Sequence, residues 1–194
     1  MVASALSHVL LCAGTVGEWA ATSSTNWRER LSLVARAARG GAAAWATIVP
    51  CGPGTADDAR RVRDMLVADC GGVRYAERIV VLGDEGVTVI VDCESDGRQR
   101  LADAAARLGG ADRRADGITE QRLSAAICAP APTEPDLVVV LGSPTKMPSS
   151  LVWELAYAEI VFFDSGWRDL DAEHLEMAID DFARRDRRFG GVDS

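Results

Sequence analysis

Short apolar runs alternate with helical segments along most of the chain. Each run is bounded by polar or turn-forming residues, which is typical of β-strands. We expect six strands, at residues 8–12, 44–49, 77–82, 87–91, 137–141 and 160–163. Strands that alternate with helices are typical of an open α/β sheet flanked by helices. The pattern therefore predicts an α/β fold with a mostly parallel six-stranded sheet.

Helical spacing of apolar residues fills most of the gaps between these strands. It predicts helices at residues 27–39, 56–70, 98–108 and 118–127, a hydrophobic helix between the last two strands, and an amphipathic helix before the terminal arginines. Thr55 and Thr119 stand where N-caps are expected, and Gly40 and Gly41 end the first helix.

Composition is consistent with one globular domain spanning residues 1–194. The chain is 48% hydrophobic and 26% charged, and we find no internal repeat and no linker. Its net charge of -8 argues against a nucleic-acid partner, because such binding needs a basic surface. No run approaches the roughly 20 apolar residues that span a bilayer, so we expect no membrane span.

The five cysteines are scattered and form no C-x-x-C pair. This pattern favours reduced thiols in a cytoplasmic protein, and it argues against a zinc site. The N-terminal apolar stretch lacks the positive residues of a signal peptide, and we interpret it as the first buried strand.

Loops after the strands are the first places to look for a site, because open α/β sheets bind ligands at the carboxyl ends of their strands. These loops cover residues 13–18, 50–56, 92–98, 142–150 and 164–168. The first contains two glycines but lacks the lysine of a phosphate-binding loop. The third contains Asp92, Glu94 and Asp96, which indicate either a divalent cation site or a solvated acidic turn.

Glu159 stands among apolar and aromatic residues, where an unpaired charge would be costly. It is either paired with an arginine or a backbone group, or it is a magnesium ligand, and the residues alone leave both open. His174 falls on a helix face that we expect to be exposed, so we interpret it as solvated rather than catalytic.

The last third of the chain resembles the cis-prenyltransferases, the undecaprenyl diphosphate synthase family. The motif W-x-x-A-Y-A-E-x-x-F-x-D matches residues 153–164, W-x-D-x-D matches residues 167–171, and F-A-x-R-x-R-R-F-G-G matches residues 182–191. The resemblance implies the open α/β fold of that family. It also implies condensation of isopentenyl diphosphate with an allylic diphosphate, using Mg²⁺ and arginine-rich diphosphate pockets.

Most of the ligands that the resemblance implies are replaced in this chain. The aspartate, asparagine and arginine of the opening M-D-G-N-G-R motif fall on Gly14, Val16 and Glu18. In the loop after residue 141, prolines replace a glutamate and a serine. The resemblance leaves Arg98 and Lys146 as candidate diphosphate-binding residues and Glu159 as the candidate Mg²⁺ ligand, and it supports no catalytic residue.

The terminal motif leads to our main hypothesis. In the family, the R-x-G sequence, here Arg188 and Gly190 within the tail at residues 184–194, reaches the isopentenyl diphosphate site of a partner. We therefore interpret the chain as a non-catalytic subunit of a heterodimeric cis-prenyltransferase, which pairs with a catalytic homologue.

Two alternatives remain open at this point. One is a divergent homodimeric prenyltransferase or terpene cyclase that acts on a short prenyl diphosphate with Mg²⁺ held by Glu159. The other is a binding module that sequesters a prenyl ligand without chemistry.

Overall fold

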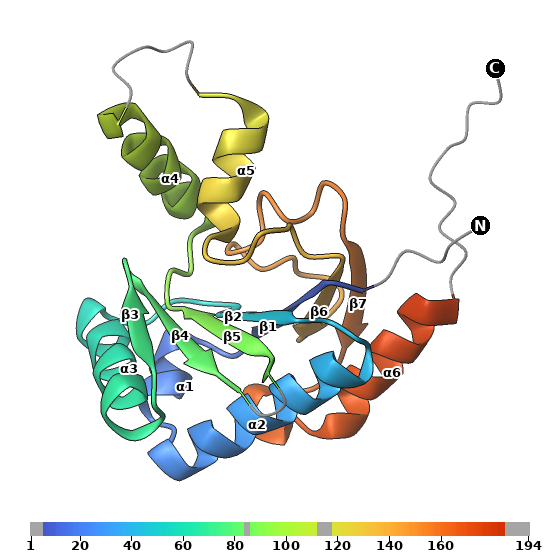
Figure 1. Ribbon diagram of the computed structural model, residues 1–194. Helices are drawn as coiled ribbons and strands as arrows, with labels where there is room; N and C mark the ends of the chain where they lie inside the picture. Colours follow the sequence, from blue (N-terminus) through green and yellow to red (C-terminus); the bar gives the residue numbers. More distant parts are fainter. Residues whose placement is uncertain (1–5, 84–85, 112–117, 185–194) are drawn as a thin grey trace, which may run out of the picture.

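A mostly parallel sheet runs through the middle of the molecule (Figure 1). The computed structural model describes residues 6–83, 86–111 and 118–184, and within them the sheet has seven strands in the order β3–β4–β5–β2–β1–β6–β7. The strands are β1 (His8–Ala13), β2 (Trp45–Val49), β3 (Val73–Tyr75), β4 (Arg78–Leu82), β5 (Thr88–Asp92), β6 (Leu137–Leu141) and β7 (Glu159–Phe163). The predicted α/β fold is confirmed, with one strand more than expected.

The additional strand is β3, which lies at the antiparallel end of the sheet. β3 is only three residues long and exposed, so it has no apolar pattern to reveal it. β3 pairs antiparallel with β4, and β4 pairs antiparallel with β5. The connections at residues 76–77 and 83–87 are too short for the crossover of a dozen or more residues that parallel strands need. Short connections therefore force two hairpins at this end.

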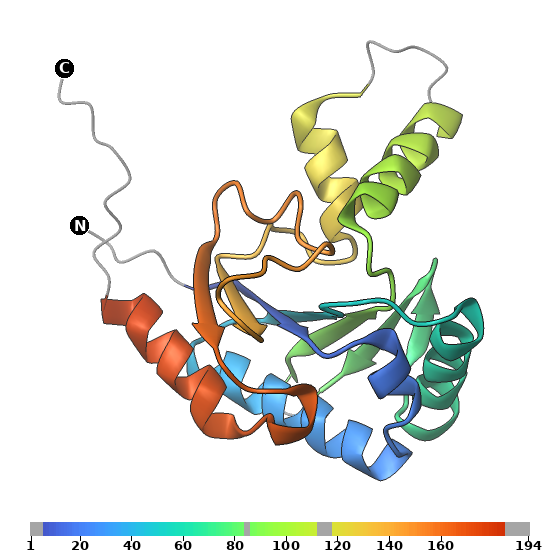
Figure 2. The ribbon, with the colours of Figure 1, turned by 180° about the vertical axis from the view of Figure 1, so that it is seen from behind.

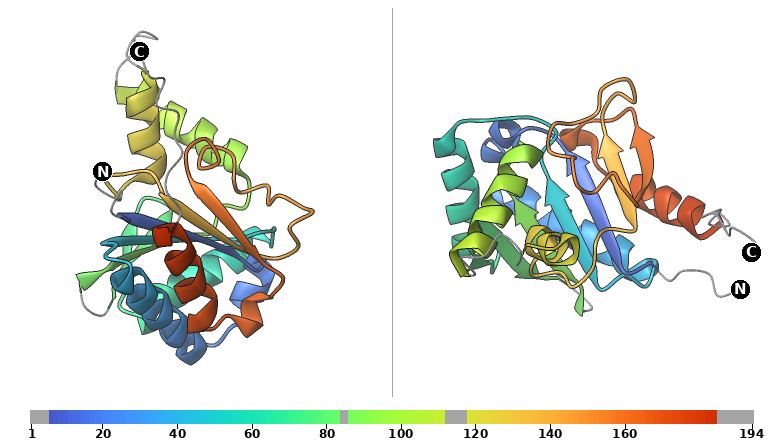
Figure 3. Two further views of the ribbon diagram at one scale, coloured as in Figure 1. Left: turned by 90° about the vertical axis from the view of Figure 1, so that its right-hand side faces the viewer. Right: turned by 90° about the horizontal axis from the view of Figure 1, so that it is seen from above.

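Helices and one long loop cover the two faces of the sheet (Figures 1 and 2). The helices are α1 (Val16–Ala20), α2 (Ser24–Gly40), α3 (Ala56–Asp69), α4 (Gly97–Ala111), α5 (Glu120–Cys128) and α6 (Ala172–Arg184), with a 3-10 turn η3 (Trp167–Asp169). α1, α2, α3 and α6 lie on one face, and α4 and α5 lie on the other (Figure 3). α1 and η3 are short elements within loops that the sequence pattern did not predict.

Strand alternation separates the core into two layers. Val9 and Leu11 of β1 face α2 and α6, whereas Leu10 and Cys12 face the loop at residues 142–158. β1 is buried along its whole length, because it has neighbours on both sides and cover on both faces.

The segment between β6 and β7 is a loop of turns, so the prediction of a hydrophobic helix there was wrong. Its side chains make tertiary contacts in several directions. Leu151 packs on the sheet, Glu154 is buried in an ion pair, and Trp153 donates a hydrogen bond from Nε1 to Glu134 Oε1 at 3.2 Å. One helical face could not make these contacts together, so they override the local helical preference.

Three tryptophans join distant parts of the chain beneath the sheet. Trp19, Trp27 and Trp167 are buried, and their ring centroids are 5.0 to 5.7 Å apart. Their indole N–H groups donate to Ala13 O, Trp19 O and Thr22 Oγ1 respectively. Arg30 lies over the Trp167 ring, with Cζ 4.8 Å from the centroid. We call Trp19, Trp27 and Trp167 the tryptophan cluster.

Helix caps follow the sequence closely. Thr55 and Thr119 are the N-caps of α3 and α5, as predicted, and Thr55 forms a reciprocal capping box with Asp58. α2 begins three residues before the predicted start, because Ser23 Oγ accepts a hydrogen bond from Asn26 N at 3.2 Å.

We expect Ser23→Ala to lower the free energy of unfolding by about 1 kcal/mol, because the N–H of Asn26 loses its acceptor at the start of α2. Urea denaturation measures this change. Thr25→Ala, an exposed change on the same helix, is the control and should alter stability by less than about 0.5 kcal/mol. Equal losses in the two variants would contradict the capping role.

Candidate functional site

The loops after β1 and β2 are joined by backbone hydrogen bonds. Gly14 O accepts from Cys51 N at 2.6 Å, and Val16 N donates to Gly52 O at 3.2 Å. A side chain at Gly54 would come within 2.7 Å of Gly17 N, so the loop lies directly against α1. These contacts occupy the edge of the sheet at the ends of its two central strands.

Gly14 has no room for a side chain. Its φ angle of 65° is in the left-handed region that favours glycine. A Cβ atom there would lie 2.7 Å from Trp167 Cβ and 3.0 Å from Trp167 Cγ. Gly14 is the position at which the resemblance calls for an aspartate, and Trp167 fills the space that this aspartate would need.

Glu18, which stands where the resemblance calls for an arginine, has a structural role. Its Oε2 accepts hydrogen bonds from Thr15 N at 2.8 Å and from Thr15 Oγ1 at 3.2 Å. Thr15 Oγ1 in turn accepts from Glu18 N, which completes a capping box at the start of α1. A carboxylate at this position repels an anion at the same edge.

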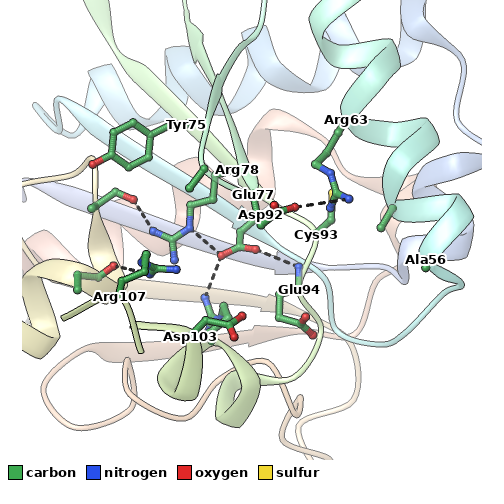
Figure 4. Close-up of a pocket in the computed structure, with 15 residues that line it drawn as sticks. Ala56, Arg63, Tyr75, Glu77, Arg78, Asp92, Cys93, Glu94, Asp103 and Arg107 are labelled. Carbon is green, nitrogen blue, oxygen red and sulfur yellow. Dashed lines mark hydrogen bonds and ion pairs between the residues drawn. The ribbon is translucent and has the colours of Figure 1, made fainter. Parts of the chain in front are cut away.

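A cavity of about 550 Å³ opens at the carboxyl end of β5 (Figure 4). It lies between α3, the β3–β4 turn, α4 and α5. Its lining combines apolar surface from Tyr75, Cys93 and five alanines with charged side chains of both signs, namely Arg63, Arg78, Arg100, Arg107, Glu77, Asp92, Glu94 and Asp103.

The arginines of this cavity are already engaged by carboxylates and carbonyls. Arg78 Nε lies 2.8 Å from Asp92 Oδ2, and Arg100 bridges Asp92 at 3.9 Å and Glu154 at 2.7 Å. Arg78 and Arg100 also donate to the carbonyl oxygens of Ala129 and Ser150. We call Arg78, Asp92, Arg100 and Glu154 the buried ion network, since each side chain is at most 12% exposed.

Outside the network, two further arginines of the cavity also have partners. Arg63 lies 3.7 Å from Glu77, and Arg107 donates to Ala126 O at 3.2 Å. Burial raises the pKa of the Cys93 thiol to about 12, so this thiol stays protonated at neutral pH. The cavity thus has paired charges and no activated nucleophile among these groups.

Sequence reasoning missed Arg78, Arg100 and Glu154. Arg78 begins a strand and Arg100 lies on the first turn of α4, where charged residues are ordinarily solvated. The one available signal was Glu154, a carboxylate inside the apolar stretch that was predicted to be a helix. Its burial would have required a cation nearby.

The acidic loop after β5 is a chain of local turns. Asp92 Oδ1 accepts from Glu94 N, Glu94 Oε1 accepts from Asp96 N, and Asp96 Oδ1 accepts from Arg98 N, all at 2.9 to 3.0 Å. Within the described ranges, no three His, Cys, Asp or Glu side chains are grouped closely enough to hold a metal ion. These carboxylates serve the backbone and the ion network and do not fit an Mg²⁺ site.

Arg98 lies on the first turn of α4 and Lys146 lies on the loop after β6, and both are exposed. The loop before α4 and the loop after β6 are joined by hydrogen bonds from Gly97 N to Ser149 O and from Ser149 Oγ to Ser95 O, both at 2.9 Å. The structure therefore brings the two loops together at the carboxyl edge, while the roles of the two side chains stay predictions.

Glu159 is partly buried and starts β7, opposite Leu137 at the start of β6. This is the amino end of the parallel strands, whereas Gly14 follows their carboxyl ends. The two positions are separated by the length of a five-residue strand, or about 16 Å. Within one protomer, Glu159 therefore lies away from the other candidates, and a shared Mg²⁺ site does not fit. Arg188 and Gly190 lie outside the described residues.

Neither histidine is exposed. His8 is buried, and His174, which we expected to be solvated, is partly buried. His174 packs against Phe163 with ring centroids 5.2 Å apart, and it contacts Asp171 at 3.0 Å. His8 is buried on β1, where Nδ1 bonds to Thr133 O at 2.9 Å and Nε2 to Thr47 Oγ1 at 2.8 Å. Burial lowers the pKa of His8, although Asp136 and Glu154 act in the opposite direction.

No helix in residues 6–83, 86–111 and 118–184 has both the length and the apolar character needed to cross a membrane.

A protein-family model described as putative undecaprenyl diphosphate synthase matches residues 72–190. This range includes the ion network and the segment whose motifs carry the resemblance. The loops around Gly14 and Cys51 lie before it.

Curated relatives have names of prenyltransferases. The chain is 36% identical over 135 residues to isoprenyl transferase 2 of Bradyrhizobium diazoefficiens, covering 67% of this chain and 53% of that protein. It is 31% identical over 125 residues to the ditrans,polycis-undecaprenyl-diphosphate synthase of Escherichia coli K12, covering 62% and 49%. The matches thus span about half the length of these relatives.

Solved structures share the fold. Lavandulyl diphosphate synthase from Lavandula x intermedia, in complex with dimethylallyl diphosphate, matches with a TM-score of 0.61 and 14% identity over 93% of this chain and 96% of that one. A probable undecaprenyl diphosphate synthase from Campylobacter jejuni matches with a TM-score of 0.56 and 14% identity over 95% and 98%. At this identity the likeness establishes the fold alone.

We expect Gly14→Asp to lower the free energy of unfolding by about 2–4 kcal/mol, because the new side chain must displace Trp167 and adopt a left-handed backbone. Gly71→Asp is the matched control, since Gly71 has a φ of 70° but open space around it. That variant should lose only about 1 kcal/mol. Equal losses, measured by urea denaturation, would show that Trp167 does not restrict position 14.

We expect acid to destabilise the protein partly through His8. Because its pKa is lower in the folded than in the unfolded state, the unfolded chain binds the extra proton first. The free energy of unfolding should therefore fall as pH drops through about 6.5, the unfolded value. It should fall less steeply in His8→Asn, measured by urea denaturation between about pH 7.5 and 5.5. Identical slopes in the two proteins would contradict the inference, since both share His174 and every carboxylate.

Proposed function

The chain belongs to the undecaprenyl diphosphate synthase family, and from that premise we propose that it is a non-catalytic subunit of a heterodimeric prenyltransferase. Its partner is a catalytic homologue that condenses isopentenyl diphosphate with an allylic diphosphate. The chain contributes its C-terminal Arg188 and Gly190 to the partner's site. In this chain, the loops at the same edge of the sheet have a structural role.

The single observation that carries this proposal is the contact between Gly14 and Trp167. A diphosphate-binding edge of this family calls for a carboxylate at position 14, and here a Cβ atom alone would be 2.7 Å from Trp167. In this chain, Trp167 of the tryptophan cluster occupies the space beside position 14.

Electrostatics support the same conclusion. Two diphosphates carry several negative charges, and binding them requires unpaired cations, backbone donors and a metal together. Glu18 places a carboxylate at the edge, and Arg78 and Arg100 are held by Asp92 and Glu154. Freeing these arginines for a ligand would leave buried carboxylates unpaired, at a cost of several kcal/mol.

Any role for Mg²⁺ or diphosphate in this proposal belongs to the assembled dimer. Glu159 lies at the amino end of β7, so it does not complete a site with the loop at Gly14 in the same protomer. Arg98 on the first turn of α4 and Lys146 on the adjoining loop after β6 are exposed, and they contribute positive charge to a surface. We assign them a secondary role as contacts for a diphosphate bound near that surface.

Co-expression with a catalytic prenyltransferase of the same host tests the proposal. We expect the pair to incorporate radiolabelled isopentenyl diphosphate at least about tenfold faster than the catalytic chain alone, which corresponds to about 1.4 kcal/mol in the barrier. Arg188→Ala should abolish most of this gain, since a guanidinium that stabilises diphosphate charge is lost.

Arg184→Ala is the matched control. Arg184 ends α6 and is exposed, and it lies 3.6 and 3.9 Å from Asp180 and Asp181. Its substitution should leave the rate of the pair within about twofold, because exposed pairs contribute little. A catalytic chain whose rate is the same with and without this protein would refute the proposal.

The names of the curated relatives favour a second candidate, a homodimeric prenyltransferase active by itself. In that case the purified chain turns over dimethylallyl, geranyl or farnesyl diphosphate with Mg²⁺, and Glu159→Gln abolishes turnover. The same assay of the protein alone therefore separates the two functions, since the first predicts no product.

A further inference from the structure

Two cysteine side chains meet at the carboxyl ends of the central strands. Cys12 lies on β1, and its Sγ atom is 3.2 Å from Sγ of Cys51 on the loop after β2. Both are free thiols in this structure. Cys12 is fully buried, whereas Cys51 is partly exposed.

The surroundings hold the pair in place. Cys51 N donates to Gly14 O at 2.6 Å, and Cys51 Sγ lies 3.6 Å from Leu141 O. On the other side, Ser150 Oγ lies 3.5 Å from Cys12 Sγ. Closing the sulfur–sulfur distance to the roughly 2.05 Å of a disulfide therefore needs only about 1 Å of movement.

We propose that Cys12 and Cys51 form a redox-active dithiol site, which a hydroperoxide converts into an intramolecular disulfide. This site is independent of the proposed subunit role, because it requires only the pairing of the two thiols.

The environment assigns a different task to each sulfur. The hydrogen bond from the Cys12 thiol lowers the pKa of Cys51, whereas burial raises the pKa of Cys12. Cys51 is therefore the thiolate that attacks, and Cys12 is the protonated thiol that resolves the intermediate.

The reaction balances in two steps. Cys51 thiolate attacks one peroxide oxygen, the O–O bond breaks, and the departing hydroxide or alkoxide takes a proton, leaving a sulfenic acid on Cys51. Cys12 sulfur then attacks Cys51 sulfur, the S–O bond breaks, and hydroxide leaves with the Cys12 proton as water. Two electrons pass from the thiols to the hydroperoxide, and a dithiol reductant reverses the change.

Peptide mapping of the wild-type protein tests the proposal directly. The reduced protein is treated with hydrogen peroxide, alkylated with iodoacetamide, digested without reductant and analysed by mass spectrometry. We expect one cross-linked peptide pair containing Cys12 and Cys51. We also expect Tm to rise by about 5–10 °C, because the cross-link closes a long loop, and to return to its first value with dithiothreitol.

Cys70 provides the matched control. It is also partly exposed, but burial raises its pKa, so iodoacetamide should label Cys51 faster than Cys70 at neutral pH. Cys70→Ser should keep the cross-link and the Tm shift, and Cys51→Ser should lose both. The proposal is wrong if peroxide modifies Cys70 in the wild-type protein while Cys12 and Cys51 remain unlinked. This result requires no variant to fold.

Discussion

The contact between Trp167 and Gly14 is the constraint on which the core between the sheet and helices α1, α2 and α6 depends. It joins the turn after β7 to the turn after β1, and through Trp19 and Trp27 it fixes α1 and the start of α2. Interiors packed at crystal-like density leave no slack for an extra side chain. The same indole therefore completes the core and also occupies the space in which a side chain at position 14 would lie.

In the buried ion network, each charged side chain has a partner of opposite sign. Asp92 and Glu154 compensate Arg78 and Arg100, and three of these four side chains, Arg78, Asp92 and Arg100, line the cavity after β5 (Figure 4). Such pairs contribute little net stability, because desolvation offsets attraction, but removing one partner is costly. The network therefore specifies how the β6–β7 loop sits on α4 more than it adds to the total free energy of folding.

Much of the fold was predictable from sequence, and the reasons for the failures are physical. The strand predicted at residues 137–141 and the N-cap predicted at Thr119 are confirmed, because burial and capping are local signals. β3 carried no pattern, and residues 150–158 looked helical because their opposing contacts, through Glu154 and Trp153, are made with distant elements. The proximity of Cys12 and Cys51 was likewise invisible, since it follows from strand register and loop path. Motif comparison identified Gly14 as the position of a missing ligand, and the structure adds that Trp167 occupies the space beside it.

The position of β1 in the sheet has a consequence for how the protein is made. β1 can pair with β2 early in synthesis, but its other neighbour, β6, is translated roughly 130 residues later. Until then β1 presents an open edge of unpaired backbone groups, bearing an almost wholly apolar sequence. Closing so long a loop is slow compared with forming the β3–β4 and β4–β5 hairpins. Until β6 is made, one edge of this apolar strand therefore lacks the partner that it has in the folded protein.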